Sequence, residues 1–99
     1  MSELKIEDVE RATMFPLFGG GEGEKYLTAS VTLPSGDFIG VSQYAGEFPN
    51  WGCDSWFKPN GYPLWSNGRG ARIGKVRAVN AELAAALNAA AGEAGLAWS

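Results

Sequence analysis

The middle of this chain reads KYLTASVTLPSGDFIGVSQY (residues 25–44), and this stretch decides the fold. Apolar residues alternate with polar ones from Leu27 to Leu33, as the side chains of a half-buried strand do. The next residues, Pro-Ser-Gly-Asp at 34–37, favour a turn, and the apolar residues after them are typical of a returning strand. Residues 25–44 are therefore predicted to form an antiparallel β-hairpin.

The segment before the hairpin shows a different period. Apolar residues recur every three or four positions from Ile6 to Thr13, and acidic residues gather where the positive end of a helix favours them. Pro16 follows this pattern and would end a helix. We therefore predict a short helix over residues 5–14. The glycines of residues 19–23 then form a connector, which lacks the Gly-Lys-Ser/Thr sequence of a phosphate-binding loop.

Glycine, proline, asparagine and aromatic residues dominate residues 45–74. Two interpretations of this region remain open. Residues 54–58 and 62–66 pair around Asn60-Gly61 as a second hairpin, or the region is an ordered loop held by its tryptophans. We favour the hairpin, which extends the predicted sheet to as many as four strands.

The last third of the chain has helical spacing of apolar residues from Ile73 to Ala90 and is rich in alanine, the best helix former. A strand over residues 72–77 is the alternative. Gly74 weakens the first turn of such a helix, which then begins near Val76. At the other end, Gly92 or Gly95 is expected to take the left-handed conformation that ends a helix, with the following apolar residues folding back.

These elements predict a single compact α+β domain over residues 1–99. It consists of a short N-terminal helix, a three- to four-stranded antiparallel sheet and a long C-terminal helix packed on one sheet face. The longest apolar run, Leu83 to Leu87, is far shorter than the about 20 residues of a membrane-spanning helix, and the first residues lack the pattern of a signal peptide. With a single cysteine, the chain is expected to be cytoplasmic.

Charge is distributed unevenly along the chain. Residues 1–54 hold nine acidic and three basic residues, whereas residues 55–99 hold two acidic and five basic ones. No acidic residue occurs between Asp54 and Glu82. Cationic and aromatic side chains together suit a nucleotide, a nucleic-acid backbone or an acidic protein surface. The predicted binding surface at residues 51–77 comprises Trp51, Lys58, Trp65, Arg69, Arg72, Lys75 and Arg77.

Two features of this surface have alternative interpretations. Trp51 and Trp65 are flanked by turn residues and are expected to be exposed, but large rings in a thin core more often pack inside it. Arg72 and Lys75 lie at the start of the predicted helix, where the helix dipole opposes positive charge. A bound phosphate or carboxylate would reverse that penalty; alternatively, these side chains extend into water.

Catalysis and metal binding have little support in the sequence. The chain has no histidine, which is the commonest general base and the commonest metal ligand. Cys53 lies next to Asp54, whose negative charge raises the pKa of a thiol, so a buried apolar role is expected for the cysteine. We predict no enzyme activity, no cofactor and no metal.

The sequence therefore predicts a small non-catalytic binding protein that acts by occlusion or sequestration. The expected partner is a larger host protein or protein complex, as for accessory inhibitors of phage. One alternative is a module that binds a nucleotide or nucleic acid through the same surface. A second alternative is an acidic nucleic-acid mimic that uses the N-terminal half.

Overall fold

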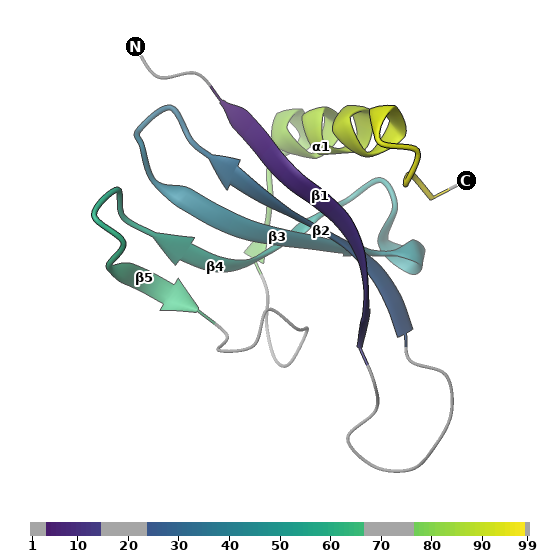
Figure 1. Cartoon of the computed structure of the whole chain (residues 1–99), viewed down its shortest axis with the longest axis horizontal. Coiled ribbons are helices and arrows are strands. Elements are labelled where there is room, and N and C mark those ends of the chain that lie inside the picture. The colour runs from purple at the N-terminus through teal and green to yellow at the C-terminus, as the bar shows by residue number, and fades with distance from the viewer. Residues whose placement is uncertain (1–3, 15–23, 67–76, 99) are drawn as a thin grey trace.

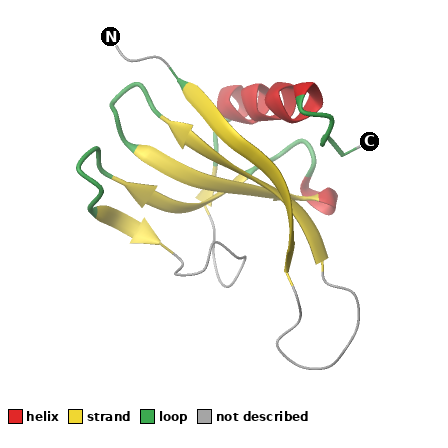
Figure 2. Ribbon diagram, in the orientation of Figure 1, coloured by secondary structure: helices red, strands yellow, loops and turns green. Residues whose placement is uncertain are grey.

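The computed structural model describes residues 4–14, 24–66 and 77–98. Within them the chain forms a six-stranded antiparallel sheet with one α-helix lying along one side of it (Figures 1 and 2). The strand order is β1-β2-β3-β4-β5, and β6 pairs with β4. The elements are β1 (Lys5–Met14), β2 (Glu24–Thr32), β3 (Phe38–Tyr44), the 3-10 turn η1 (Ala45–Glu47), β4 (Gly52–Phe57), β5 (Pro63–Ser66), β6 (Arg77–Ala78) and α1 (Ala81–Glu93).

The predicted central hairpin is confirmed as β2 and β3. Their register pairs Ala29 with Val41 and Val31 with Ile39, which places these apolar side chains on one face of the sheet. The turn closes through a hydrogen bond from the Gly36 N–H to the Leu33 carbonyl, 2.8 Å long. Gly36 has a φ of 92°, a conformation that glycine adopts without a steric penalty.

The predicted N-terminal helix is wrong, because residues 5–14 form the edge strand β1. A register shift between Glu7 and Glu10 inserts one additional residue opposite Ala29, and Asp8 takes a φ of 55°. This bulge lets both Ile6 and Val9 pack against the core although they are three residues apart. A bulged strand thus reproduces the helical spacing of apolar residues, and the acidic residues of this segment lie on a sheet edge instead of a helix.

The sheet is also larger than predicted. The second hairpin is confirmed as β4 and β5, joined by a turn in which Gly61 has a φ of 88°. The edge strand β1 and the short strand β6 add further pairing. The predicted layout, with an N-terminal helix and three or four strands, is therefore replaced by a five- to six-stranded antiparallel sheet with one helix in the C-terminal region.

The C-terminal helix begins later than predicted. Arg77 and Ala78 belong to β6, and α1 starts after Asn80, whose side chain accepts a 2.7 Å hydrogen bond from the Leu83 N–H. Residues 72–76 lie outside the described residues. The end of α1 is as predicted: Gly95 has a φ of 74°, and the Leu96 N–H donates to the Ala91 carbonyl at 2.9 Å.

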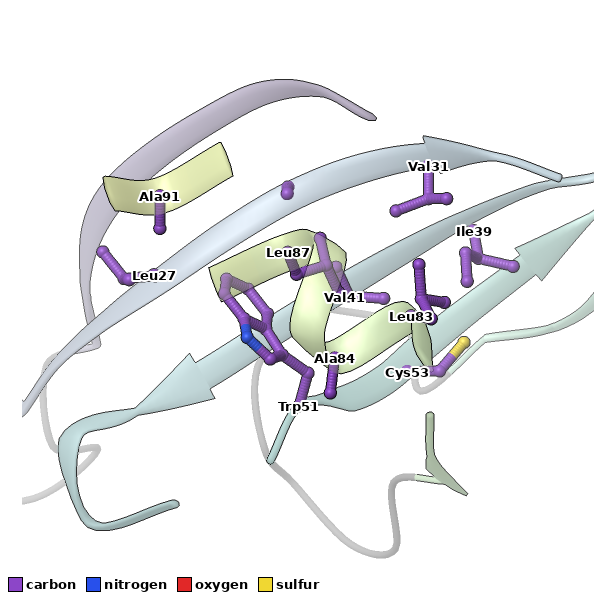
Figure 3. Packing of buried hydrophobic residues seen from close by; sticks show 11 residues of the cluster. Leu27, Val31, Ile39, Val41, Trp51, Cys53, Leu83, Ala84, Leu87 and Ala91 are labelled. Carbon is purple, nitrogen blue, oxygen red and sulfur yellow. The ribbon is translucent and has the colours of Figure 1, made fainter. Parts of the chain in front are cut away.

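The core lies between α1 and one face of the sheet (Figure 3). Leu87 of α1 is fully buried, and the small side chains of Ala84 and Ala91 let the helix approach the strands closely. The buried apolar cluster comprises Leu27, Ala29, Val31, Ile39, Val41, Trp51, Cys53, Leu83, Ala84, Leu87 and Ala91.

A second bulge, in β4, depends on a glycine of β3. Gly40 pairs with Ser55 and Val41 pairs with Cys53, so Asp54 is the additional residue between them. A Cβ atom at Gly40 would lie 2.6 Å from the Ser55 Oγ and 3.0 Å from the Asp54 Oδ1. Gly40 therefore provides the space that the two polar side chains of the bulge occupy.

Gly40→Ala is expected to lower the free energy of unfolding by about 1–3 kcal/mol, because the new methyl group overlaps the Ser55 hydroxyl. Urea denaturation measures this loss. Gly46→Ala is the control, since a Cβ there meets no atom within 4 Å, and it should change stability little. Equal stability of the Gly40→Ala variant and the parent protein would contradict this account of the bulge.

Candidate binding site

Two of the predicted site residues lie together beside β4. Trp65 of β5 pairs with Trp56, and Arg77 of β6 pairs with Cys53, so β5 and β6 flank the same edge of β4. The Arg77 Cζ lies 4.7 Å from the centroid of the Trp65 ring. This distance is that of a cation–π contact, which holds the guanidinium over the ring.

Trp51 is not part of this surface. It was predicted to be exposed, but it is 1% exposed and packs beside Ala84 and Leu87 of α1 (Figure 3). Its Nε1–H donates to the Asn88 Oδ1 at 2.8 Å, which removes the cost of burying the indole nitrogen. Trp65 is half-buried against the core, so the prediction of exposure is wrong for Trp51 and only partly met for Trp65.

Lys58, another predicted site residue, does not join the pair. Lys58 is exposed in the turn between β4 and β5, where its N–H donates to the Tyr62 carbonyl at 2.9 Å. Arg69, Arg72 and Lys75 lie outside the described residues. Of the residues predicted to form the binding surface, Trp65 and Arg77 are therefore in contact, and Lys58 lies in the neighbouring turn.

A groove, named here the α1 groove, runs beside the start of α1 and consists of two adjoining pockets. The larger has a volume of about 280 Å³ and is lined by Leu33, Ile39, Cys53, Trp56, Arg77 and Leu83, among others. The smaller has a volume of about 240 Å³ and is lined by Leu4, Leu33, Pro34, Asn80, Glu82 and Leu83. Leu33, Asn80 and Leu83 line both pockets, which makes the groove continuous.

The α1 groove carries opposite charges at its two pockets. Arg77 lines only the larger pocket and Glu82 only the smaller one. Within residues 4–14, 24–66 and 77–98, neither side chain forms a salt bridge; the ion pair found there joins Lys5 and Glu7 of β1. The Trp65 Nε1 is buried and has no hydrogen-bond acceptor in the same part of the chain, but Trp65 is not among the lining residues of either pocket. The groove thus combines an apolar lining with charges of opposite sign that are available to a ligand.

The residues that shape the groove were not among the predicted site residues, apart from Arg77. Leu33 and Leu83 follow strand and helix patterns that predict core positions, and only the packing of α1 on the sheet leaves a pocket between them. Trp56 is fixed by a 2.9 Å hydrogen bond from its Nε1–H to the Asp37 Oδ2. Its pairing with Trp65 followed from the predicted hairpin, but its place in the groove had no signal in the sequence.

Exposed apolar side chains also occur near the tips of the hairpins, and the sequence did not single out most of them. Phe38 stacks on Phe57 with ring centroids 5.3 Å apart and is itself 38% exposed. Tyr62 and Leu64 of the second hairpin are 71% and 49% exposed. These side chains are not among the lining of either pocket of the α1 groove.

Cys53 is buried, as predicted, at the base of the larger pocket. Burial raises the pKa of its thiol to about 11, and the negative charge of Asp54 adds to this shift. A hydrogen bond with the Ser55 backbone and the positive charge of Arg77 act in the opposite direction. The thiol therefore stays protonated at neutral pH and is a poor nucleophile.

Asp54 and Ser42 form a small buried polar cluster on the other face of the sheet. Asp54 is 4% exposed and Ser42 is fully buried. Burial raises the pKa of the Asp54 carboxyl. The hydroxyls of Ser55 and Ser42 oppose the shift, although only the Ser55 Oγ, 3.2 Å from the Asp54 Oδ1, lies in hydrogen-bonding geometry.

Three further findings bear on function. In the described part of the chain, no three histidine, cysteine, aspartate or glutamate side chains gather where they could hold a metal ion. No helix in the same part is long and apolar enough to cross a membrane. Comparison of the chain with family models, with curated proteins and with solved structures gave no match.

The reactivity of Cys53 gives a direct test of its environment. A thiol with a pKa of about 11 holds about a hundredth of the thiolate that one with the ordinary value of 9.0 holds at pH 8. Alkylation of the native protein by iodoacetamide, followed by mass spectrometry, should therefore be at least about a hundredfold slower than alkylation of the protein in urea. Equal rates in the two states would contradict a buried, protonated thiol.

The raised pKa of Asp54 predicts a pH-dependent stability. The carboxyl binds its proton more tightly in the folded than in the unfolded chain, so the free energy of unfolding falls as pH rises from the unfolded pKa through the folded one. Asp54→Asn should remove this fall and raise the Tm at pH 7 by a few degrees.

Thermal melts of the parent protein and of the Asp54→Asn variant, recorded from pH 3 to pH 7, test this prediction. The advantage of the Asp54→Asn variant should disappear at the acidic end, where the native carboxyl is protonated in both states. Glu93→Gln, at an exposed position near the end of α1, is the control and should melt like the parent protein. A lower Tm for Asp54→Asn at pH 7 would show that the ionised carboxyl stabilises the fold.

Proposed function

We propose that this chain is a small non-catalytic binding protein that occludes or sequesters a larger protein through the α1 groove. The observation that carries the proposal is the Arg77 guanidinium, held 4.7 Å from the centroid of the Trp65 ring and lining an apolar pocket of about 280 Å³. Tryptophan and arginine are the side chains that most often dominate the binding energy of protein interfaces.

The order of the Arg77 side chain supports a binding role. Its contact with Trp65 restricts the guanidinium before a partner arrives, so less conformational entropy is lost when a carboxylate binds. Arg77 is exposed and has no carboxylate partner among the described residues. Its five N–H donors are thus available for a two-point contact with an acidic group.

The lining of the groove favours a protein over a nucleotide. The two pockets of the α1 groove are lined largely by apolar side chains, with Arg77 as the one basic residue among the described lining of both. They suit single apolar side chains of a partner, whereas a nucleotide would depend on Arg69, Arg72 and Lys75, which lie outside the described residues.

Charge reversal at Arg77 tests this proposal. Affinity capture from a lysate of the source cells, quantified by mass spectrometry, should recover a partner with the parent protein and lose most of it with Arg77→Glu. Lys25→Glu is the matched control, because it makes the same change of charge on β2, away from the groove, and should retain the partner.

A third variant, Lys58→Glu, measures whether the contact surface extends to the turn between β4 and β5. Equal recovery with Arg77→Glu and the parent protein would refute the proposal. Equal loss with Arg77→Glu and Lys25→Glu would refute it too, because net charge rather than the groove would then govern capture.

A further inference from the structure

We infer that the α1 groove binds a short segment of its partner with two neighbouring apolar side chains, an acidic group beside one and a basic group beside the other. This inference rests on the proposed function and specifies the chemistry of the partner. It follows from the division of the groove into two pockets and from the different charge at each pocket.

The two pockets are adjoining and similar in volume, about 280 and 240 Å³. Leu33, Asn80 and Leu83 line both, so the two pockets share part of their walls. Two apolar side chains of one segment can occupy the two neighbouring pockets. Their burial removes apolar surface from water, which makes the apolar pair the main source of affinity.

The larger pocket favours an acidic residue of the partner next to the apolar side chain that it binds. Arg77 supplies a guanidinium that is oriented by Trp65. Among the described residues that line this pocket none is acidic, since Glu82 lines only the other pocket. A carboxylate of the partner at this position would gain a charge-assisted contact with Arg77.

The smaller pocket favours a basic residue of the partner next to the apolar side chain that it binds. Glu82 is exposed in the first turn of α1, and it pairs with no lysine or arginine in the described part of the chain. The other described residues that line this pocket are uncharged. A lysine or arginine of the partner would therefore meet an unopposed carboxylate, and the two charges together would fix the direction in which the segment lies.

Selection from a display library of random short peptides tests the inference. Peptides selected on the parent protein should share two apolar residues, with an acidic residue on one side of the pair and a basic residue on the other. Selection on Arg77→Glu should replace the acidic residue by a basic one, and selection on Glu82→Lys should replace the basic residue by an acidic one.

Titration of a selected peptide measures how much each charged side chain contributes to affinity. Each charge reversal in the protein should weaken binding about fivefold, and the complementary reversal in the peptide should restore it. Trp56 lines the larger pocket, so its fluorescence should change when the peptide binds, and Trp56→Phe should abolish this change. Lys25→Glu should leave affinity unchanged. Both charged side chains are exposed, so the variants should fold, and thermal melts check this.

Three results would overturn the inference: no peptide selected, peptides without a charge preference, or a preference that the variants do not change. The proposed function is tested separately by capture of the protein partner. If capture depends on Arg77 while the peptides fail, the function stands and the partner is recognised in another way. If capture is also independent of Arg77, both proposals fail.

Discussion

The position of α1 on the sheet depends on one partly buried amide, that of Asn88. Its Oδ1 accepts hydrogen bonds from the Trp51 Nε1 at 2.8 Å and from the Gln43 Nε2 at 3.2 Å. Its Nδ2 donates to the Pro49 carbonyl at 3.0 Å. Trp51 is almost fully buried, and removal of the amide would leave its indole N–H without this acceptor in the core. The helix is therefore fixed at a specific place and not only pressed against an apolar surface.

The two ends of α1 have different surroundings, and this difference accounts for the groove. At the C-terminal end, the Arg11 Nη2 of β1 donates to the Leu96 carbonyl at 3.1 Å, and the Arg11 Cζ lies 4.9 Å from the centroid of the Trp98 ring. These contacts close that side of the core. At the N-terminal end, β6 is only two residues long, and Leu33 and Leu83 are left lining open pockets. The binding site that we propose lies at this end of α1.

The sequence predicted those elements whose signals are local. The central hairpin combines strict alternation with a turn that contains Gly36, and the second hairpin and the glycine that ends α1 have similarly clear turn residues. Residues 5–14 were mistaken for a helix because the bulge at Asp8 places Ile6 and Val9 on one face three residues apart. No local signal distinguishes that bulge from a helical turn. The start of α1 was likewise set by the cap at Asn80 and not by the periodicity before it.

The site was predictable only in part, since it is built from residues that are distant in sequence. Clustering of aromatic and basic residues singled out Trp65 and Arg77, and the pairing of β4 with β5 and β6 brings these two side chains together. Trp51 has similar neighbours in sequence, yet a hydrogen bond to Asn88, 37 positions away, makes it a core residue. The pockets arise because α1 packs beside Leu33. The sequence pattern of a single helix or strand does not predict such packing.

The central claim is that the buried contact between Trp51 and Asn88 fixes α1 and thereby shapes the groove. Hydrogen exchange of the Trp51 indole N–H, followed by NMR, tests it most directly. The account predicts that this proton exchanges only through global unfolding, so its free energy of opening equals the free energy of unfolding measured with denaturant. Exchange as fast as that of a solvent-exposed indole would contradict the claim, because α1 would then leave the sheet without unfolding of the whole domain.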